Sequence, residues 1–259
     1  IGITCANING TQIGGRRNLI INGAMNVAQR GTSSTTSGYY SVDRFASTYS
    51  GTDEATTQEQ ADVASGTTPY TLGFRKSFKI TNGNQTSGAG AADMLRTRYV
   101  VEAQDVATSG WNYTDSNSFI TLQFWIKSSV AQNFYGQIRA ADGTSQSFSF
   151  ETGSLTANTW TKVIKSIPGN SNLTFNNDNG AGIYIYFFPY SGTDYTDAGV
   201  SLNTWSAYAS GTRTPVNTTT WYTTNDATIE FTGYQLEVGS QATAFEHRNF
   251  GDELALCQR

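Results

Sequence analysis

The chain has 259 residues, of which 14% are charged, 37% hydrophobic and 13% aromatic. Charged residues usually make up about a quarter of a globular protein, and the Ala, Leu, Glu and Lys of long helices are scarce here, so the composition excludes a helical bundle. A net charge of −4 and a pI near 5.0 argue against nucleic acid as a partner, because phosphate binding needs a clustered basic surface. The length suits one large β domain or two small ones.

The two ends of the chain give few functional signals. Residues 1–17 are rich in Gly, Asn and Thr, and we expect a tether or the end of a preceding module. Because the chain starts at Ile1, we expect it to be part of a longer protein. No run approaches 18 apolar residues, so no membrane-spanning helix is predicted. Cys5 and Cys257 lie far apart and outside any CxxC motif, and we interpret them as free thiols that bind no metal.

From Asn18 onward the sequence predicts a series of short strands separated by polar turns, and the alternation of apolar and polar residues specifies several of them. In 74–80, Phe74, Phe78 and Ile80 should share one face. In 119–127, an inward row should contain alternate residues, namely Ile120, Leu122, Phe124 and Ile126. Segments 134–140 and 146–150 should form a hairpin, since Asp-Gly between them favours a tight turn.

Three further strands are expected toward the C-terminus. Residues 160–167 form one, and residues 183–188 form a central strand, apolar on both faces and ended by Pro189. In 228–238 the apolar parity changes between Thr232 and Gly233, which indicates a β-bulge. Residues 50–70 are expected to form a loop or short helix, and residues 189–226 a long loop of functional character. Together these segments predict an all-β, two-sheet antiparallel β-sandwich of jelly-roll type.

Four segments in this order carry a family resemblance. They are Asn18–Gly31 (NLIINGAMNVAQRG), Tyr40–Phe45 (YSVDRF), Leu122–Ser128 (LQFWIKS), and Phe231–Gly239 (FTGYQLEVG) leading to Ala242–Arg248 (ATAFEHR). The set resembles the jelly-roll modules near the ends of tail-fibre and receptor-binding proteins of tailed bacteriophages, a family similar to carbohydrate-binding modules. The resemblance covers residues 18–259.

The resemblance implies a setting and partners. It implies a jelly-roll module over residues 18–248, with residues 249–259 starting a C-terminal exit segment. It also implies an extracellular position on a virion fibre, a homotrimer, other virion proteins as neighbours, and contact with bacterial surface polysaccharide. No membrane insertion is expected. A head-fibre or capsid-decoration role stays open, because such modules occur on several virion parts.

The aromatic loop offers the candidate carbohydrate site. Sugars stack their apolar C–H faces on Trp and Tyr rings while Asp and Asn bind the hydroxyls. The candidate site residues are Trp205, Tyr208, Trp221, Tyr222, Tyr195, Asp194 and Asp197. The alternative is that Trp205 and Trp221 anchor the loop on the sandwich or line a trimer interface. A structural calcium ion at Asp194 and Asp197 is a further, less favoured alternative, and no other cofactor is expected.

Other conspicuous residues have structural interpretations. Trp125 is expected to be buried against a second layer, and Asp43–Arg44 to form a partly exposed pair. Glu237 and Glu246 are expected to pair with Arg44 or Arg248. Glycosidases need two suitably spaced carboxylates, and no catalytic motif is present, so no enzyme activity is expected. The sequence thus leaves two functions: a glycan-binding fibre module, or a structural fibre or capsid module without a ligand.

Overall fold

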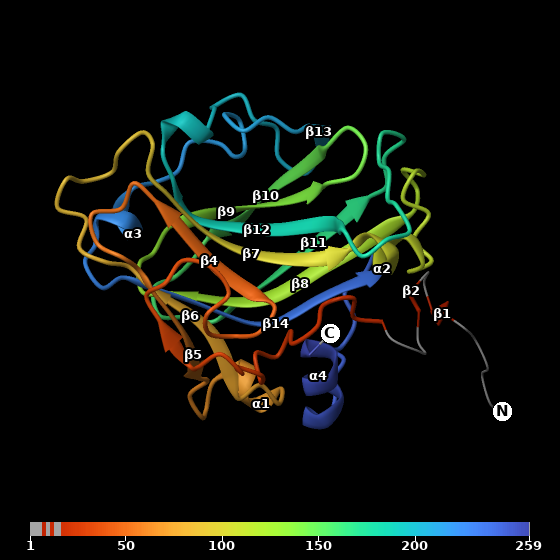
Figure 1. Ribbon diagram of the computed structural model, residues 1–259, viewed down its shortest axis with the longest axis horizontal. Helices are drawn as coiled ribbons and strands as arrows, with labels where there is room; N and C mark the ends of the chain where they lie inside the picture. Colours follow the sequence, from red (N-terminus) through yellow and green to blue (C-terminus); the bar gives the residue numbers. More distant parts are fainter. Residues whose placement is uncertain (1–6, 9–10, 13–16, 259) are drawn as a thin grey trace.

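Two six-stranded antiparallel sheets pack face to face in the computed structural model, which describes residues 7–8, 11–12 and 17–258 (Figure 1). The first sheet has the order β13 (Trp205–Ala207), β10 (Gln146–Ser154), β9 (Asn133–Ala140), β12 (Ala181–Ser191), β7 (Met94–Glu102) and β4 (Phe45–Ser50). The second has the order β11 (Thr161–Pro168), β8 (Phe119–Ser128), β14 (Thr228–Val238), β6 (Lys76–Thr81), β5 (Thr57–Asp62) and β3 (Ser33–Ser34). The predicted jelly-roll β-sandwich is confirmed.

Short elements complete the chain. Strands β1 (Asn7–Ile8) and β2 (Thr11–Gln12) pair with each other, and they fall within the expected tether, most of which lies outside the described residues. The helical elements are short: α1 (Thr68–Thr71), α2 (Ala103–Ala107), η1 (Thr193–Tyr195), α3 (Thr220–Thr223) and α4 (Phe250–Cys257). Among the residues described, no helix is long and apolar enough to cross a membrane.

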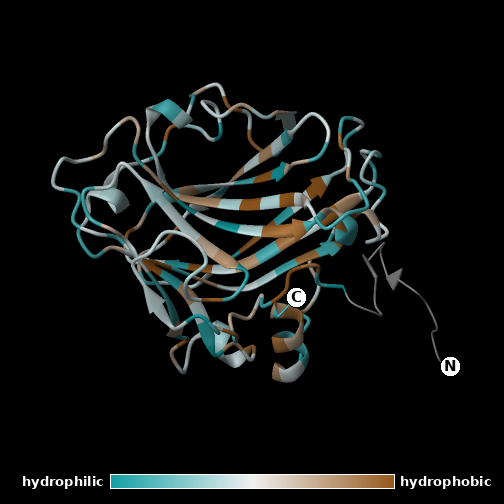
Figure 2. Cartoon of the chain, viewed as in Figure 1, coloured by the Kyte–Doolittle hydropathy of each residue, from teal (hydrophilic) through white to brown (hydrophobic). Residues whose placement is uncertain are grey.

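The core fills the space between the sheets with aromatic and branched side chains. Ile120, Leu122 and Phe124 of β8 are fully buried, as the alternation predicts, and hydrophobic and hydrophilic bands alternate along the central strands (Figure 2). The Phe124 ring stacks on Tyr234 at 4.7 Å between centroids, and Phe187 of the first sheet meets Phe231 of the second at 4.8 Å. Such aromatic contacts add roughly 0.5–1.5 kcal/mol beyond area burial, so the two sheets are fixed to each other.

The predicted hairpin and bulge are both confirmed. Strands β9 and β10 pair antiparallel around the turn that contains Gly143, whose φ is +59°. In β14 the register shifts between Thr232 and Gln235, where Gly233 has a φ of +66°. This bulge moves the apolar row back to the core after the parity change.

Three local expectations need correction. Pro189 does not end its strand, because β12 continues to Ser191 through a register shift between Phe187 and Tyr190 that accommodates the proline. Segment 50–70 contains β5, a polar strand near the sheet edge whose pairing with β6 outweighs its weak alternation. Phe74 precedes β6 and packs outside the main core, in a cluster with Ala24 and Val63.

Candidate functional site

Two of the predicted site residues, Trp221 and Tyr222, lie in the core. Both are 0% exposed, on α3. Trp221 Nε1 donates to the carbonyl of Thr228 at 3.0 Å, and the Tyr222 ring stacks on Tyr190 at 4.2 Å. A sugar ring cannot reach either side chain, so these two residues are corrected from ligand contacts to anchors of the long segment.

Trp205 anchors the edge strand β13. Its Nε1 donates to the carbonyl of Pro168 at 2.7 Å, and its ring lies 5.5 Å from Phe148. Together with Asp197 it lines an open hollow of about 430 Å³. Trp205 is therefore partly accessible, but it faces this edge hollow and not the broad face of the sheet described below.

The two acidic candidates lie in exposed turns. Asp194 belongs to η1, and Asp197 Oδ1 accepts a hydrogen bond from the backbone N–H of Gly199 at 2.6 Å. Within the described part of the chain, no group of three or more acidic, His or Cys side chains could hold a metal ion. The turn contact gives Asp197 a local structural role.

Tyr195 and Tyr208 reach the outer face of the first sheet. The guanidinium of Arg213 lies 4.7 Å from the Tyr195 ring centroid, and that of Arg139 lies 3.9 Å from the Tyr208 ring centroid. The segment that carries these tyrosines is held on the sheet because Gln137 Nε2 and Ser149 Oγ donate to the carbonyl of Arg213 at 2.8 and 2.6 Å. The segment therefore forms a wall over part of this face.

The outer face of the first sheet combines tyrosines with arginines. Strand register produces this pattern, since Tyr186 of β12 lies between Arg98 of β7 and Gln137 of β9, and Tyr184 lies beside Arg139. We call this surface the tyrosine–arginine face, and it consists of Tyr39, Arg96, Arg98, Arg139, Tyr184, Tyr186, Tyr195, Tyr208 and Arg213. None of these residues except Tyr195 and Tyr208 was predicted.

The aromatic rings of β12 form a row that runs from a covered end to an open end. Phe188 is 1% exposed and Tyr186 is 6% exposed, whereas Tyr184 is only partly buried. Consecutive rings are nearly parallel, with centroids 5.5 Å apart for Tyr184–Tyr186 and 6.0 Å apart for Tyr186–Phe188. Tyr184 is therefore partly exposed to solvent, and its ring is held in place by stacking on the buried Tyr186.

Each arginine of the face lies against an aromatic ring. Arg98 is 5.2 Å from the Tyr39 centroid, Arg96 is 5.0 Å from Tyr186, and Arg139 also approaches Tyr184 at 5.8 Å. Such cation–π contacts hold the guanidinium groups in place. The tyrosines and arginines therefore form one preorganised surface.

The arginines of the face have no carboxylate partners among the described residues. The ion pairs of the described chain involve other basic residues, such as Arg44 with Glu102 and Arg248 with Glu253. Burial lowers the pKa of the Arg96 guanidinium, and the neighbouring cations Arg213 and Arg98 act in the same direction. The face is thus a partly desolvated, uncompensated positive surface on a protein of net negative charge.

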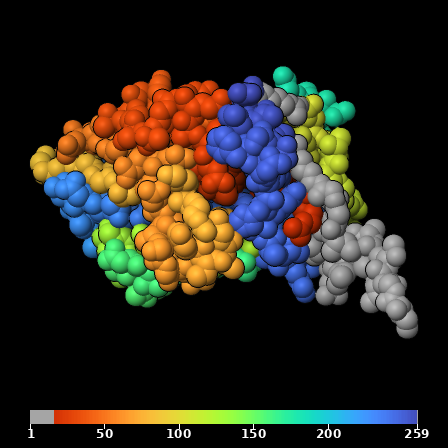
Figure 3. Space-filling view, turned by 90° about the horizontal axis from the view of Figure 1, so that it is seen from below, coloured from red at the N-terminus to blue at the C-terminus, as the bar shows by residue number. Residues whose placement is uncertain are grey.

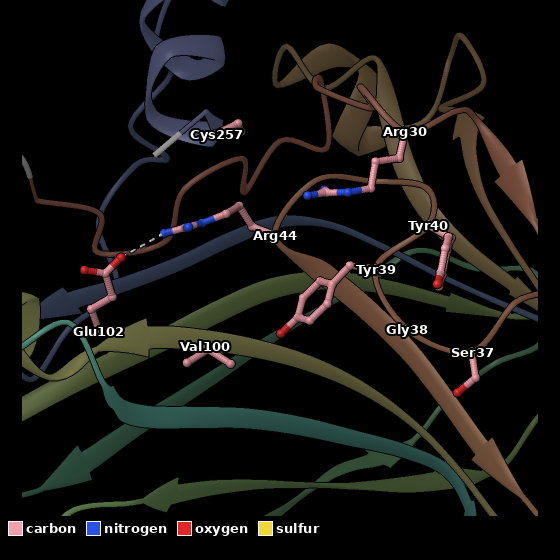
Figure 4. A pocket seen from close by; sticks show the side chains of 9 residues that line it. All are labelled: Arg30, Ser37, Gly38, Tyr39, Tyr40, Arg44, Val100, Glu102 and Cys257. Atoms are coloured by element: carbon pink, nitrogen blue, oxygen red, sulfur yellow. Dashed lines mark ion pairs between the residues drawn. The ribbon is translucent and has the colours of Figure 1, made fainter.

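A hollow of about 600 Å³ continues the face at the Val100 end of β7 (Figure 4). Tyr39 lines both the face and the hollow, and its ring lies near Val100. Arg44 Nη2 is 3.7 Å from Glu102 Oε1 at one side of the hollow, and the Arg30 side chain points toward Arg44 (Figure 4). The face and the hollow together offer an extended surface across several strands.

The remaining candidates have environments that match the expectations only in part. Trp125 is partly buried in the cluster around Phe74. Glu237 accepts hydrogen bonds from Gln123, Gln235 and Thr243, and so it pairs with neither Arg44 nor Arg248.

The structure also shows the ion-pair partners of Glu246 and Asp43. Glu246 lies 3.7 Å from Arg248, in agreement with the expected structural pair. The expected Asp43–Arg44 pair does not form. Asp43 forms an ion pair with Arg30 at 3.7 Å, and Arg44 forms one with Glu102 at 3.7 Å. These carboxylates thus belong to the scaffold.

The sequence carried a signal for the missed residues. In 183–188, a second aromatic row (Tyr184, Tyr186, Phe188) alternates with the core row, and in 94–102 Arg96 and Arg98 occupy the outward parity. Aromatic and basic residues at outward positions indicate a face with a function beyond the core. The pairing of β7 with β12 brings these two patterns together.

Comparison with known proteins yields only distant similarities. No family model matches the sequence, and no curated protein matches it. A CBM4 structure aligns with a TM-score of 0.38 at 11% identity, covering 84% of this chain and 97% of that one. The family 11 carbohydrate-binding module from Clostridium thermocellum, in complex with a β-1,3-1,4-mixed-linked tetrasaccharide, gives 0.33 at 11% identity, covering 83% and 98%. The N-terminal cellulose-binding domain of Cellulomonas fimi β-1,4-glucanase C gives 0.37 at 10% identity, covering 84% and 99%. Similarity at this level does not identify a ligand, which has to be inferred from the face itself.

Proposed function

We propose that the protein binds polysaccharide on its tyrosine–arginine face. The observation that carries this proposal is the presence of partly exposed tyrosines from separate elements, Tyr39, Tyr184 and Tyr208, beside guanidinium donors on one sheet face. Tyrosine rings offer flat amphipathic surfaces at a small entropy cost. A sugar ring can stack on them while the arginines donate to its oxygens.

The shape of the surface favours a chain over a small ligand. Arg98, Tyr184 and Arg139 lie on β7, β12 and β9, so contacts continue across neighbouring strands. The adjoining hollow extends this surface beyond Val100 of β7. Small-molecule sites usually enclose most of their ligand, whereas this surface can accommodate several consecutive units of a polymer.

The setting that we propose is an external fibre of a tailed bacteriophage, where the module meets bacterial surface glycan. Support comes from the family resemblance of the four sequence segments. Two of them supply β8 and β14, whose Leu122, Phe124, Phe231 and Leu236 are buried core residues. The resemblance thus concerns the scaffold and its setting, while ligand choice depends on the face. A homotrimer is part of this proposal, and the molecular mass in solution tests it.

We propose that binding occurs without hydrolysis. Glu102 is paired with Arg44, and Glu151 Oε2 accepts a hydrogen bond from Asn133 Nδ2 at 2.8 Å. Glycosidases use two carboxylates about 5–10 Å apart, one of them with a raised pKa. Glu102 and Glu151 serve instead as partners of neighbouring side chains, which suits a binding module.

Glycan-array and calorimetric measurements with host envelope polysaccharides test the proposal. Tyr184→Ala and Tyr208→Ala should each weaken binding by roughly tenfold, because central aromatic anchors commonly contribute more than about 1 kcal/mol. Tyr70→Ala is the matched control, since Arg75 stacks on Tyr70 at 3.9 Å outside this face.

Two results would contradict the proposal. If the native protein binds none of its host's envelope glycans, the purely structural fibre or capsid role becomes the better account. If Tyr70→Ala weakens binding as strongly as Tyr184→Ala, the ligand does not bind on the tyrosine–arginine face.

A further inference from the structure

We infer that the polysaccharide is acidic, with carboxylate, phosphate or sulfate groups that bind the arginines of the tyrosine–arginine face. This inference rests on the proposed function and names the chemical class of its ligand. Its basis is the distribution of charge among the described residues, together with hydrogen-bond donors that have no partner.

All four arginines of this face lack an acidic partner among the described residues. Elsewhere on the described chain, Arg30, Arg44 and Arg248 each have a carboxylate within 4 Å. By contrast, no described ion pair includes the face arginines, which are Arg96, Arg98, Arg139 and Arg213. Arg17 and Arg75 also lack an ion pair within the described chain, but the four face arginines form one group that no described acid compensates, although acids outnumber bases by 20 to 16 in the whole chain.

Several donors on these arginines are buried without a hydrogen-bond partner. The Nε atoms of Arg98, Arg139 and Arg213 are all in this state. Arg213 is only 9% exposed, and its Nη1 contacts the sulfur of Met94 at 2.8 Å, a weak acceptor. Buried unpaired donors are uncommon and costly in folded proteins, and an anion on this face would supply the missing acceptors.

Contact with an aromatic ring does not use the hydrogen-bond donors of a guanidinium group. A guanidinium that lies over an aromatic ring keeps its N–H groups in its own plane, where a carboxylate or phosphate can accept two of them. The Arg139 guanidinium lies 3.9 Å from the Tyr208 centroid and 5.8 Å from the Tyr184 centroid, and its Nη2 donates to Ser145 Oγ at 3.2 Å. A sugar stacked on Tyr184 would thus place an acidic substituent within reach of Arg139.

A polysaccharide fits better than a nucleic acid. Proteins that bind nucleic acids generally carry a basic domain with pI above about 9, whereas this chain has a pI near 5.0. All basic residues of the face are arginines, and the surrounding protein is acidic overall. Repulsion of a densely charged strand by the rest of the protein would oppose binding, while an acidic sugar with spaced charges meets only the face.

The test compares acidic with neutral glycans on the whole protein. The acidic probes are polygalacturonate, heparin and a glycerol-phosphate teichoic acid, and the neutral probes are carboxyl-reduced polygalacturonate and dextran, with single-stranded DNA as a further arm. We expect at least one acidic probe to bind about tenfold or more tightly than its neutral counterpart at low salt, and the affinity to fall as NaCl is raised.

Arginine variants assign the effect to the face. Arg98→Gln and Arg139→Gln should each weaken acidic-glycan binding about tenfold or more, since charge-assisted hydrogen bonds are the strong ones. Arg75→Gln is the control, because Arg75 also stacks on a tyrosine but lies outside the face. Circular dichroism of each variant shows that it is folded.

The outcomes separate this inference from the proposed function. Binding of neutral glycans that depends on Tyr184 but not on Arg98 or Arg139 overturns the acidic ligand and leaves glycan binding intact. Binding to no glycan overturns both. Tighter binding to single-stranded DNA than to every acidic glycan also overturns the inference.

Discussion

Neighbouring aromatic residues of β12 serve different purposes because successive side chains of a strand point to opposite faces. Phe187 contacts Phe134 and Phe231 between the sheets, while Tyr186 and Tyr184 line the outer face. Phe188 belongs to the outer row as well, but it is 1% exposed, whereas Tyr184 at the open end of the row is partly exposed. The polar tip of tyrosine lets a ring remain partly exposed and still rigidly packed.

The thiol of Cys257 should react slowly in the folded protein. Burial raises its pKa from 9.0 to about 12, and Asp43 and Glu253 act in the same direction. Because the thiolate is the nucleophile, iodoacetamide at pH 9 should modify Cys257 at least roughly tenfold faster in urea than in buffer. Mass spectrometry of a Cys5→Ser variant measures both rates without interference from Cys5.

The raised pKa of Cys257 also makes the stability of the folded protein depend on pH. The raised pKa means that the folded state favours the protonated thiol, so its contribution to stability is complete below the unfolded pKa of 9.0 and is lost as the pH rises through about 12. Equal alkylation rates in buffer and urea would show that α4 leaves the thiol exposed.

At the scale of elements, the bulge in β14 requires glycine at position 233. Its φ of +66° is a conformation that L side chains rarely adopt, and a Cβ there would lie 2.8 Å from Cζ of Phe74. Gly233→Ala should therefore destabilise the protein through strain of about 1–2 kcal/mol and through overpacking of about 1–3 kcal/mol. Urea unfolding measures the total loss of unfolding free energy from strain and overpacking.

Gly66→Ala is the matched control for the bulge. Gly66 has a φ of +82°, and no atom lies within 4 Å of the position that a Cβ would take there, so its substitution carries only the conformational strain. We expect a smaller loss of unfolding free energy than for Gly233→Ala. If both variants lose the same unfolding free energy, the contact of the added Cβ with Phe74 does not contribute to the destabilisation.

Individual strands were predictable where one face is apolar. The alternation in β8 and the parity change in β14 specify both strands and the bulge, because burial of one face imposes a period of two. Strand β5 was missed, since Gln58 is buried through hydrogen bonds to the carbonyls of Thr36 and Gly38 and not through apolar contact. Local hydrophobicity cannot reveal such a strand.

The candidate site was only partly predictable for a different reason. The aromatic content of 189–226 indicated a functional segment, and Tyr195 and Tyr208 do reach the outer face. Trp221 and Tyr222 return to the core, because α3 packs against β12. The face itself depends on which distant strands pair, such as Arg98 with Tyr186, and no local pattern encodes that pairing.

At the scale of the whole molecule, the two ends of the described chain pack together on the second sheet. The C-terminal segment lies beside the N-terminal segment in Figure 3, and Glu246 Oε2 accepts from the backbone N–H of Asn18 at 2.6 Å. Arg248 donates to the carbonyls of Asn18 and Ile20, and Gln123 of β8 donates to the carbonyl of Thr243 at 2.8 Å. These contacts cover part of the second sheet's outer face.

The first sheet is covered differently. The segment that carries Tyr195 and Arg213 crosses only part of its outer face, so Tyr39, Tyr184 and Tyr208 remain partly accessible. The molecule thus has one outer face partly covered by its own chain ends, with a smaller hollow of about 230 Å³ at Trp125, and one that presents aromatic and cationic groups. This asymmetry is the central reason for placing the ligand on the first sheet.

Hydroxyl-radical footprinting with and without a bound host polysaccharide tests this placement most directly. The account predicts that the ligand lowers the oxidation rates of Tyr39, Tyr184 and Tyr208 together, while Tyr70 and Trp125 on other parts of the surface keep theirs. Protection centred on Trp125 or Trp160, with Tyr184 unchanged, would contradict the account and move the binding surface to the second sheet.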